Sequence, residues 1–306
     1  MYDIPILFVI FKRKETALKS FQQIKTTKPQ KLYIAGDGAR ENIVGEAEKV
    51  KETRQAILNA IDWECDVHTL FRDRNLGCSE GVYSAINWLF EHEEQGIIIE
   101  DDCVMRSSFF PFVKEMLERY KDDSRIGMID GANYMKTSIP YSYGFSRFKS
   151  TNGWATWKRA WNNMDLSMQW RNGEWEKSII ANTGYHAKDI KYWRYRLKAI
   201  DSKTVSAWDW QWYFTLASQN QLGIYPNVSL QTNIGFGEDA THTSNSETPE
   251  KYISKHEMTF PLSHPKYIVP YDSFEKEFYQ QNVTLFERIK ELFPIKIKEQ
   301  IKKIIR

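Results

Sequence analysis

The sequence predicts an α/β fold with a doubly wound, largely parallel central sheet flanked by helices. Short apolar runs alternate with amphipathic segments through the first hundred residues, and this alternation is typical of βαβ units with parallel strands. A second observation is the apolar run Ile97–Ile99, which follows Gly96 and is typical of a strand buried on both faces. The run ends in three carboxylates, Glu100, Asp101 and Asp102. Carboxylates at the carboxyl end of such a strand lie where open α/β sheets bind ligands.

The composition is that of an ordinary globular protein. The 306 residues suffice for one large α/β domain or two modest ones, with 42% hydrophobic and 27% charged residues. The net charge of +2 argues against bulk electrostatic binding, so no nucleic acid is expected as a partner. Three cysteines without a CxxC pair fit a reducing compartment. Because no secretory signal pattern and no apolar run of transmembrane length is found, we expect a cytoplasmic protein.

The first strand is expected at Ile4–Phe11, followed by an amphipathic helix. Arg13 stands at their junction, where basic residues and a helix N-terminus can bind an anion. For the neighbouring Lys12 and Lys14, a solvated turn is an equally good interpretation.

The second strand, Lys31–Ala35, leads to Asp37, which stands between Gly36 and Gly38. Glycines on both sides let the backbone turn sharply and keep this carboxylate exposed. A long amphipathic helix is expected next, and then a third strand at Cys65–Phe71.

A polar loop follows the third strand and opens the next helix. It contains three candidate nucleotide-contacting residues, Arg72, Asn75 and Gly77. In a doubly wound sheet the carboxyl ends of neighbouring strands meet at the switch point. We therefore expect this loop, Arg13, Asp37 and the acidic triplet to surround one crevice, as in a nucleotide site.

The acidic triplet has two interpretations. Adjacent carboxylates repel one another, and burying one without a partner is costly. A divalent cation such as Mn²⁺ or Mg²⁺ resolves this conflict, because both ions prefer hard oxygen ligands. Alternatively, the acids and Ser107–Ser108 only cap the next helix.

The texture of the chain changes beyond this point. A helix is expected at Phe109–Tyr120 and a strand at Ile126–Ile129, and from Tyr141 Gly, Ser, Asn and Trp become frequent. We predict two halves that share one core and a C-terminal tail: residues 1–135, residues 136–285 and residues 286–306.

Aromatic residues crowd the second half between Trp154 and Tyr225. A large aromatic core explains more than half of them, and the others are candidates for sugar stacking, with Trp154 and Trp208 as the preferred pair. Asp209 lies between Trp208 and Trp210, and an acid flanked by indoles can have a raised pKa and act as a base. The alternative role for Asp209 is N-cap of the helix that follows.

Two features remain in the last third. A strand expected at Ile224–Ser229 precedes a Gly-rich loop that carries His242. A loop histidine is usually a surface residue, but near a metal site it could complete the coordination sphere. The segment Phe286–Arg306 has a basic amphipathic pattern. It could bind the inner face of an anionic membrane peripherally, or dock on the protein itself or on a partner.

Four motifs, in matching order, make the chain resemble the GT-A glycosyltransferases, nucleotide-sugar-dependent enzymes with a Rossmann-like donor half. VIFKR at Val9–Arg13 is similar to the family's first strand, and GDG at Gly36–Gly38 to its second strand end. IIIEDDCV at Ile97–Val104 resembles its EDD form of the DxD motif, and AWDWQW at Ala207–Trp212 resembles its WDDW segment. The likeness is greatest to the inverting N-acetylglucosaminyltransferase I type, whereas the RNLGCSEG loop is closer to bacterial family-two-like glycosyltransferases.

The resemblance implies a role for each matched residue. Arg13 would approach the nucleotide, Asp37 would contact the uracil, and Asp102 would ligate Mn²⁺ or Mg²⁺. Asp209 would take the proton from the acceptor hydroxyl. The remaining acids would contact ribose or donor-sugar hydroxyls: Glu100 and Asp101.

The implied activity is metal-dependent transfer of a hexose or N-acetylhexosamine from a UDP-sugar to a glycan or lipid-linked acceptor, with inversion, in polysaccharide biosynthesis. The first half would then bind the donor, and the second half would bind the acceptor and carry the catalytic base. One alternative is a sugar-nucleotide nucleotidyltransferase, although no Gly-rich loop with a basic end follows the first strand. The other is a catalytically silent glycan-binding module kept for its aromatic surface.

Overall fold

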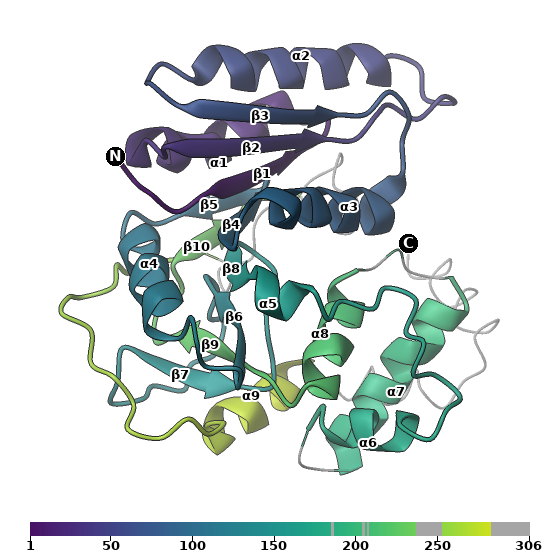
Figure 1. Ribbon diagram of the computed structural model, residues 1–306, viewed down its shortest axis with the longest axis vertical. Coiled ribbons are helices and arrows are strands. Elements are labelled where there is room, and N and C mark those ends of the chain that lie inside the picture. Colours follow the sequence, from purple (N-terminus) through teal and green to yellow (C-terminus); the bar gives the residue numbers. More distant parts are fainter. Residues whose placement is uncertain (185–186, 204–205, 207, 237–252, 283–306) are drawn as a thin grey trace.

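The computed structural model describes residues 1–184, 187–203, 206, 208–236 and 253–282. In this part of the chain, eight strands form one sheet in the order β3-β2-β1-β4-β8-β6-β9-β7. Figure 1 shows this sheet running from β3 at the top to β7 at the bottom, with helices on both faces. The prediction of an α/β fold with a largely parallel, Rossmann-like sheet is therefore confirmed.

The first half of the chain supplies four neighbouring parallel strands. These are β1 (Ile6–Ile10), β2 (Lys31–Gly36), β3 (Asp66–Phe71) and β4 (Gln95–Glu100). The helices that connect them are α1 (Lys14–Thr27), α2 (Glu46–Ala60) and α3 (Gly77–His92). Each apolar run that the sequence indicated in this half forms a strand of the sheet.

A strand from the second half sits inside the sheet. Strand β8 (Trp154–Trp157) pairs antiparallel with both β4 and β6 (Ile126–Asp130). Strand β9 (Leu222–Pro226) is parallel to β6, and β7 (Tyr143–Ser146) closes this edge in the antiparallel direction. One sheet thus runs through both predicted halves.

The two faces of the sheet carry different helices. Helices α1, α2 and α4 (Phe109–Arg119) cover one face, while α3, α5 (Lys158–Trp161) and α8 (Asp209–Ser218) cover the other. In β4, Ile97 and Ile99 point to the first face and Ile98 to the second. Burying each of these side chains stabilises the fold by roughly 1.5–3 kcal/mol. The burial of strand β4 therefore fixes the position of the acidic residues that follow it.

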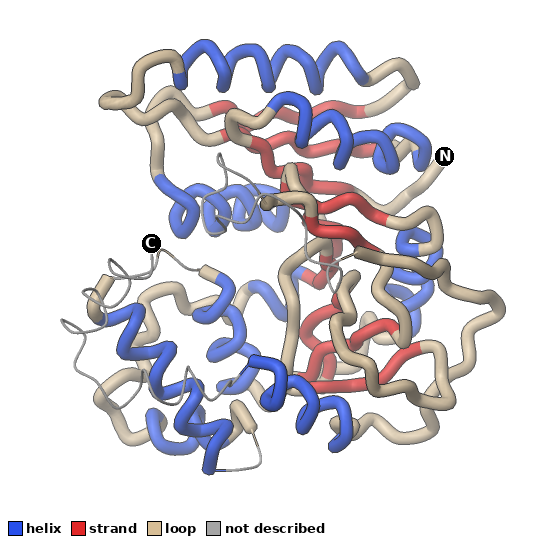
Figure 2. The backbone as a smooth tube through the Cα atoms, turned by 180° about the vertical axis from the view of Figure 1, so that it is seen from behind, coloured by secondary structure: helices blue, strands red, loops and turns tan. Residues whose placement is uncertain are grey.

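A second sheet of two antiparallel strands continues from β4. It consists of β5 (Cys103–Met105) and β10 (Gln231–Asn233). Three further helices pack beside α8 and the lower end of the large sheet, as Figure 2 shows from behind: α6 (Glu176–Ala181), α7 (Ala187–Asp201) and α9 (Asp272–Asn282). None of the helices among the described residues is long and apolar enough to cross a membrane.

Candidate active site

The acidic triplet forms a tight turn between the two sheets. Strand β4 ends at Glu100, and Asp101 and Asp102 make the turn into β5. Because β1 and β4 are neighbours, with Val9 opposite Glu100, the residues after β1 face this turn. The Nη2 atom of Arg13 donates to Asp101 Oδ1 at 2.5 Å and to Asp102 Oδ2 at 3.0 Å. The structure therefore brings together the basic junction and the acids, as the sequence predicted.

Backbone and side-chain contacts hold the turn in place. The N–H of Phe11 donates to Asp101 Oδ2 at 3.2 Å, and the Ser20 hydroxyl donates to the Asp101 carbonyl at 2.8 Å. From the other side, the N–H of Ile234 donates to the Asp102 carbonyl at 2.8 Å. A methyl group on residue 235 would lie only 2.2 Å from Asp102 Oδ2, so any larger residue there would displace the Asp102 carboxylate. The sequence did not show that residues 234–235 support the acids.

The acidic side chains of the turn outnumber the positively charged groups near them. Burial raises the pKa of Glu100, and the neighbouring Asp102, Asp101 and Asp209 raise it further. Burial also raises the pKa of Asp101, although Arg13 lowers it. One guanidinium thus faces several carboxylates, and this imbalance favours binding of an additional cation.

The donor atoms of the turn fit a metal that a nucleotide helps to hold. Among the described residues, no group of three or more His, Cys, Asp or Glu side chains is arranged to hold a metal by itself. Mg²⁺ in nucleotide enzymes is bound through only one or two carboxylates, with phosphates and water completing the shell. The half-buried carboxylate of Asp102 meets that requirement. The other predicted ligand, His242, lies outside the described residues.

Asp37 is bound to the backbone of the loop after β3. Its carboxylate accepts the N–H groups of Leu76 and Gly77, the latter at 2.9 Å. The Asn75 side chain donates to the Gly38 carbonyl at 2.8 Å. Gly77 has φ +81°, a conformation that suits glycine, and begins α3. These residues shape the loop, and a contact between Asp37 and the nucleobase stays a prediction.

Two arginines, Arg54 and Arg72, make further hydrogen bonds that hold this loop in place. Arg72 donates to the Ser84 hydroxyl at 2.7 Å. The Nη2 atom of Arg54 donates to three carbonyl groups, those of Gly36, Asp37 and Arg72. Sequence reasoning missed Arg54, because a cation on an amphipathic helix is usually on the solvated face. The predicted contact of Arg72 with the nucleotide also stays a prediction.

Asp209 begins helix α8, and the N-cap position belongs to Trp208. The predicted alternative, that Asp209 is the cap of this helix, is therefore wrong. Because the charge of Asp209 contributes to the raised pKa of Glu100, the two side chains lie within electrostatic range of each other.

A cavity of about 270 Å³ opens beside Asp209. Its lining includes the buried Asp130 at the end of β6 and Tyr213 of α8. Polar groups continue around it, with Asn152 donating to the Tyr134 hydroxyl at 2.9 Å. Sequence reasoning missed Asp130, although an acid directly after the apolar strand Ile126–Ile129 is the same pattern that identified the acidic triplet.

The predicted sugar-stacking pair is part of the core, which corrects that expectation. Trp154 is completely buried and Trp208 is 3% exposed. They stack on each other with ring centroids 5.8 Å apart and also contact Trp161 and Trp212. Because these rings cover one another between the sheet and α8, no face is open to a sugar.

Comparisons with known proteins identify no family for this chain. No family model matches it, and no curated protein matches it. Among solved structures, a cytidylyltransferase from Leptospira borgpetersenii has 10% sequence identity and a TM-score of 0.34, over 54% of this chain and 64% of that one. HddC from Yersinia pseudotuberculosis has 10% identity and a TM-score of 0.31, over 52% and 78%. A UDP-glucose pyrophosphorylase complexed with UDP-glucose has 10% identity and a TM-score of 0.29, over 53% and 78%.

These similarities are too distant to argue an activity. Two of the three names denote nucleotidyltransferases, the class that the sequence left as the alternative. The names are therefore closer to that alternative than to a glycosyltransferase, and the choice between the two classes depends on the site.

Proposed function

We propose that the chain is a metal-dependent glycosyltransferase that moves a sugar from a nucleoside diphosphate, with UDP as the expected nucleotide, to an acceptor hydroxyl with inversion. The observation that carries this proposal is the position of Asp209. It lines a cavity of about 270 Å³ and acts electrostatically on the acidic turn at the end of β4. A carboxylate that lines the proposed acceptor cavity and acts on the proposed donor site is suited to the role of general base.

The donor side of the proposed site consists of Arg13 and the acidic turn. Asp102 would hold Mn²⁺ or Mg²⁺ together with the diphosphate, and such an ion stabilises the negative charge of a leaving diphosphate. Glu100 and Asp101 would accept hydrogen bonds from ribose or donor-sugar hydroxyls. Arg13 already lies against Asp101 and Asp102, so it is placed to bind a phosphate oxygen as well.

The acceptor side of the proposed site is the cavity next to α8. Asp209 would accept the proton of the acceptor hydroxyl as that oxygen attacks the anomeric carbon, while the bond to the diphosphate breaks. Asn133 and Asn152 line the same cavity, and their amides donate to the Pro226 carbonyl and the Tyr134 hydroxyl. Each would give its second N–H to a sugar hydroxyl. The cavity would receive one sugar ring of the acceptor, and a glycan or a lipid-linked glycan is the expected acceptor.

The geometry gives less support to a nucleotidyltransferase. Only Phe11, Lys12 and Arg13 connect β1 to α1, and three residues are too few for a Gly-rich loop that wraps a triphosphate. Release of pyrophosphate from a sugar phosphate and a nucleoside triphosphate would nevertheless identify that class directly.

The Asp209→Asn variant tests the proposal. Asparagine keeps the size of aspartate but cannot accept a proton at neutral pH. With UDP-, GDP- and CMP-sugars and Mn²⁺, transfer by the variant should fall about 10²–10⁴-fold. Its UDP affinity in calorimetry should match that of the wild type, because Asp209 is not on the donor side.

Asp272→Asn is the matched control. Asp272 is the first residue of α9, as Asp209 is of α8, but it does not line the cavity. The control should keep full activity. If Asp209→Asn retains more than about a tenth of wild-type turnover, the loss is smaller than the usual contribution of a general base. The base must then be another residue. If the wild type binds glycans but neither transfers nor hydrolyses any donor, the silent binding module is correct.

A further inference from the structure

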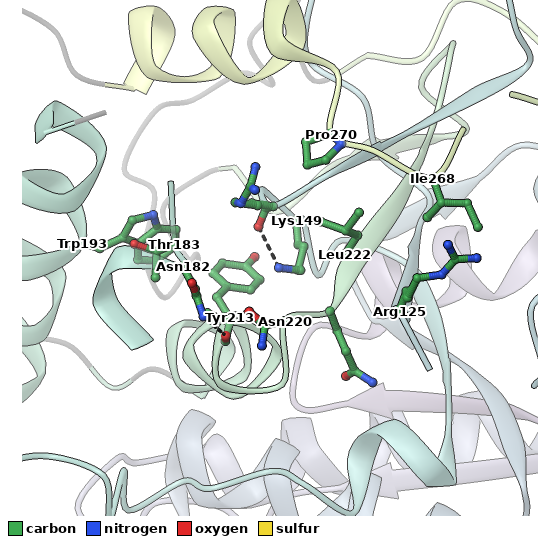
Figure 3. A pocket seen from close by; sticks show the side chains of 13 residues that line it. Arg125, Lys149, Asn182, Thr183, Trp193, Tyr213, Asn220, Leu222, Ile268 and Pro270 are labelled. Atoms are coloured by element: carbon green, nitrogen blue, oxygen red, sulfur yellow. Dashed lines mark hydrogen bonds between the residues drawn. The ribbon is translucent and has the colours of Figure 1, made fainter. Parts of the chain in front are cut away.

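A second cavity, of about 230 Å³, lies between α6, α8 and the edge of the sheet formed by β9 and β7. Figure 3 shows the side chains that surround it, with Lys149 among them. Arg125 precedes β6 and Leu222 begins β9, so the cavity lies toward the end of the sheet away from the acidic turn. Lys149 and Tyr213 line both this cavity and the one beside Asp209.

The lining of this second cavity is cationic. It includes Arg125, Arg147 and Lys149, and no carboxylate is among the described residues that line it. The acids that pair with the two arginines lie outside the lining: Asp123 binds Arg125 at 2.7 Å, and Glu275 binds Arg147 at 3.3 Å. Three cationic side chains thus contribute to the lining, and two of them are paired with acids that are not part of it.

Lys149 is the central group of the cavity. It is 7% exposed, and its Nζ donates to the Arg147 carbonyl at 2.7 Å. An ammonium has three donors, and this bond accounts for one of them within the described part of the chain. Burial lowers the pKa of Lys149 to about 8 against the opposing effect of Asp130 and Glu275, so the charge is retained at neutral pH. An anion in the cavity would accept a further hydrogen bond from this ammonium.

The remaining polar groups and the size of the cavity limit the ligand. Asn182, Thr183 and Asn220 line the side opposite Arg125, and their amides and hydroxyl suit a hydroxylated molecule. The volume is below the range of about 300–1,000 Å³ that holds a drug-sized ligand. We propose that this cavity binds the phosphate or carboxylate group of a small hydroxylated molecule. This inference does not depend on the proposed transferase activity.

Asn220→Asp tests the inference without disturbing the core. Asn220 has φ +55°, which aspartate also tolerates, and its Oδ1 accepts from Asn182 at 2.8 Å, a bond that a carboxylate can keep. The change therefore adds one negative charge at the cavity. Asn172→Asp is the matched control, because Asn172 has φ +60° and is exposed away from the cavity.

The measurement is calorimetric titration of the full chain at pH 7 with inorganic phosphate, glucose 6-phosphate, glucuronate and glucose. We expect at least one of the three anions to bind and neutral glucose not to bind. Asn220→Asp should weaken the affinity for the anion about tenfold or more because of charge repulsion, and Asn172→Asp should leave that affinity unchanged. Lys149→Met should abolish binding.

The choice of probes distinguishes recognition of the anionic group alone from recognition of the hydroxyl groups attached to it. Equal affinity for inorganic phosphate and glucose 6-phosphate would show that the site recognises phosphate alone. Tighter binding of glucose 6-phosphate or of glucuronate would show that the hydroxyls contribute. If no anion binds at low millimolar concentration, or if Asn220→Asp binds as well as the wild type, the inference is refuted, whatever the result for Asp209→Asn.

Discussion

Arg13→Met should destabilise the protein through the acidic turn. The guanidinium of Arg13 forms ion pairs with Asp101 and Asp102, and the three side chains are 20%, 7% and 22% exposed. Removing one partner of a buried ion pair costs about 3–5 kcal/mol, because the other charge is left without compensation. Since Arg13 and Asp102 keep some contact with solvent, we expect the lower end, about 3 kcal/mol of unfolding free energy.

Urea denaturation followed by tryptophan fluorescence measures this loss. Arg125→Met is the control, because Arg125 also pairs with an aspartate through two bonds but is 63% exposed. Its removal should cost less than about 1 kcal/mol. Arg13→Lys keeps the charge but loses the forked geometry, so its stability should lie between those of the wild type and Arg13→Met. If the free energy of unfolding of Arg13→Met lies within about 1 kcal/mol of the wild-type value, Arg13 does not compensate the charges of Asp101 and Asp102.

Three further changes test other parts of the molecule. Asp102→Ala should abolish the Mn²⁺ dependence of UDP binding in calorimetry, and an affinity that still responds to metal would contradict its assignment as ligand. Gly235→Ala places a methyl group 2.2 Å from Asp102 Oδ2, so it should lower the free energy of unfolding by about 1–3 kcal/mol and weaken the Mn²⁺-dependent binding of UDP. In the control Gly173→Ala, where the nearest contact is 3.4 Å, neither the stability nor the UDP binding should change. Glu46→Gln should reduce the stability at pH 7 by up to about 3 kcal/mol, because Arg40 and Lys12 lower the pKa of the buried Glu46 to about 2. A lowered carboxyl pKa stabilises the fold above the unfolded pKa, so urea titrations should show the difference shrinking as the pH falls from about 4.5 toward 2, and a difference independent of pH would refute this origin.

Apolar runs made the fold class predictable. Ile97–Ile99 and the runs in β1 and β2 are hydrophobic at consecutive positions because both faces of each strand are covered. The place of β8 could not be predicted, because WATW resembles any aromatic segment and nothing local specifies its antiparallel insertion between β4 and β6. Strand order depends on tertiary packing, which a pattern along the chain does not contain.

The contact between the basic junction and the acids was predictable from the sequence, whereas the burial of individual side chains was not. The meeting of Arg13 with Asp101 and Asp102 follows from the rule that the carboxyl ends of parallel strands share one edge. The error on Trp154 and Trp208 arose because a sequence does not tell which indole faces solvent. Asp37 was expected to be exposed, but the backbone that folds over it comes from residues 76–77, about forty positions later.

The position of β8 also has a consequence for how the protein is made on the ribosome. In the described sheet, β4 and β6 are joined only through β8, whose first residue, Trp154, is synthesised more than fifty residues after the end of β4. Until then the nascent chain carries β4 as an unpaired edge rich in isoleucine, which is a template for pairing with other chains. A released polypeptide that ends before Trp154 should therefore aggregate or depend on a chaperone, whereas a chain long enough for β8 to leave the ribosome can cover that edge.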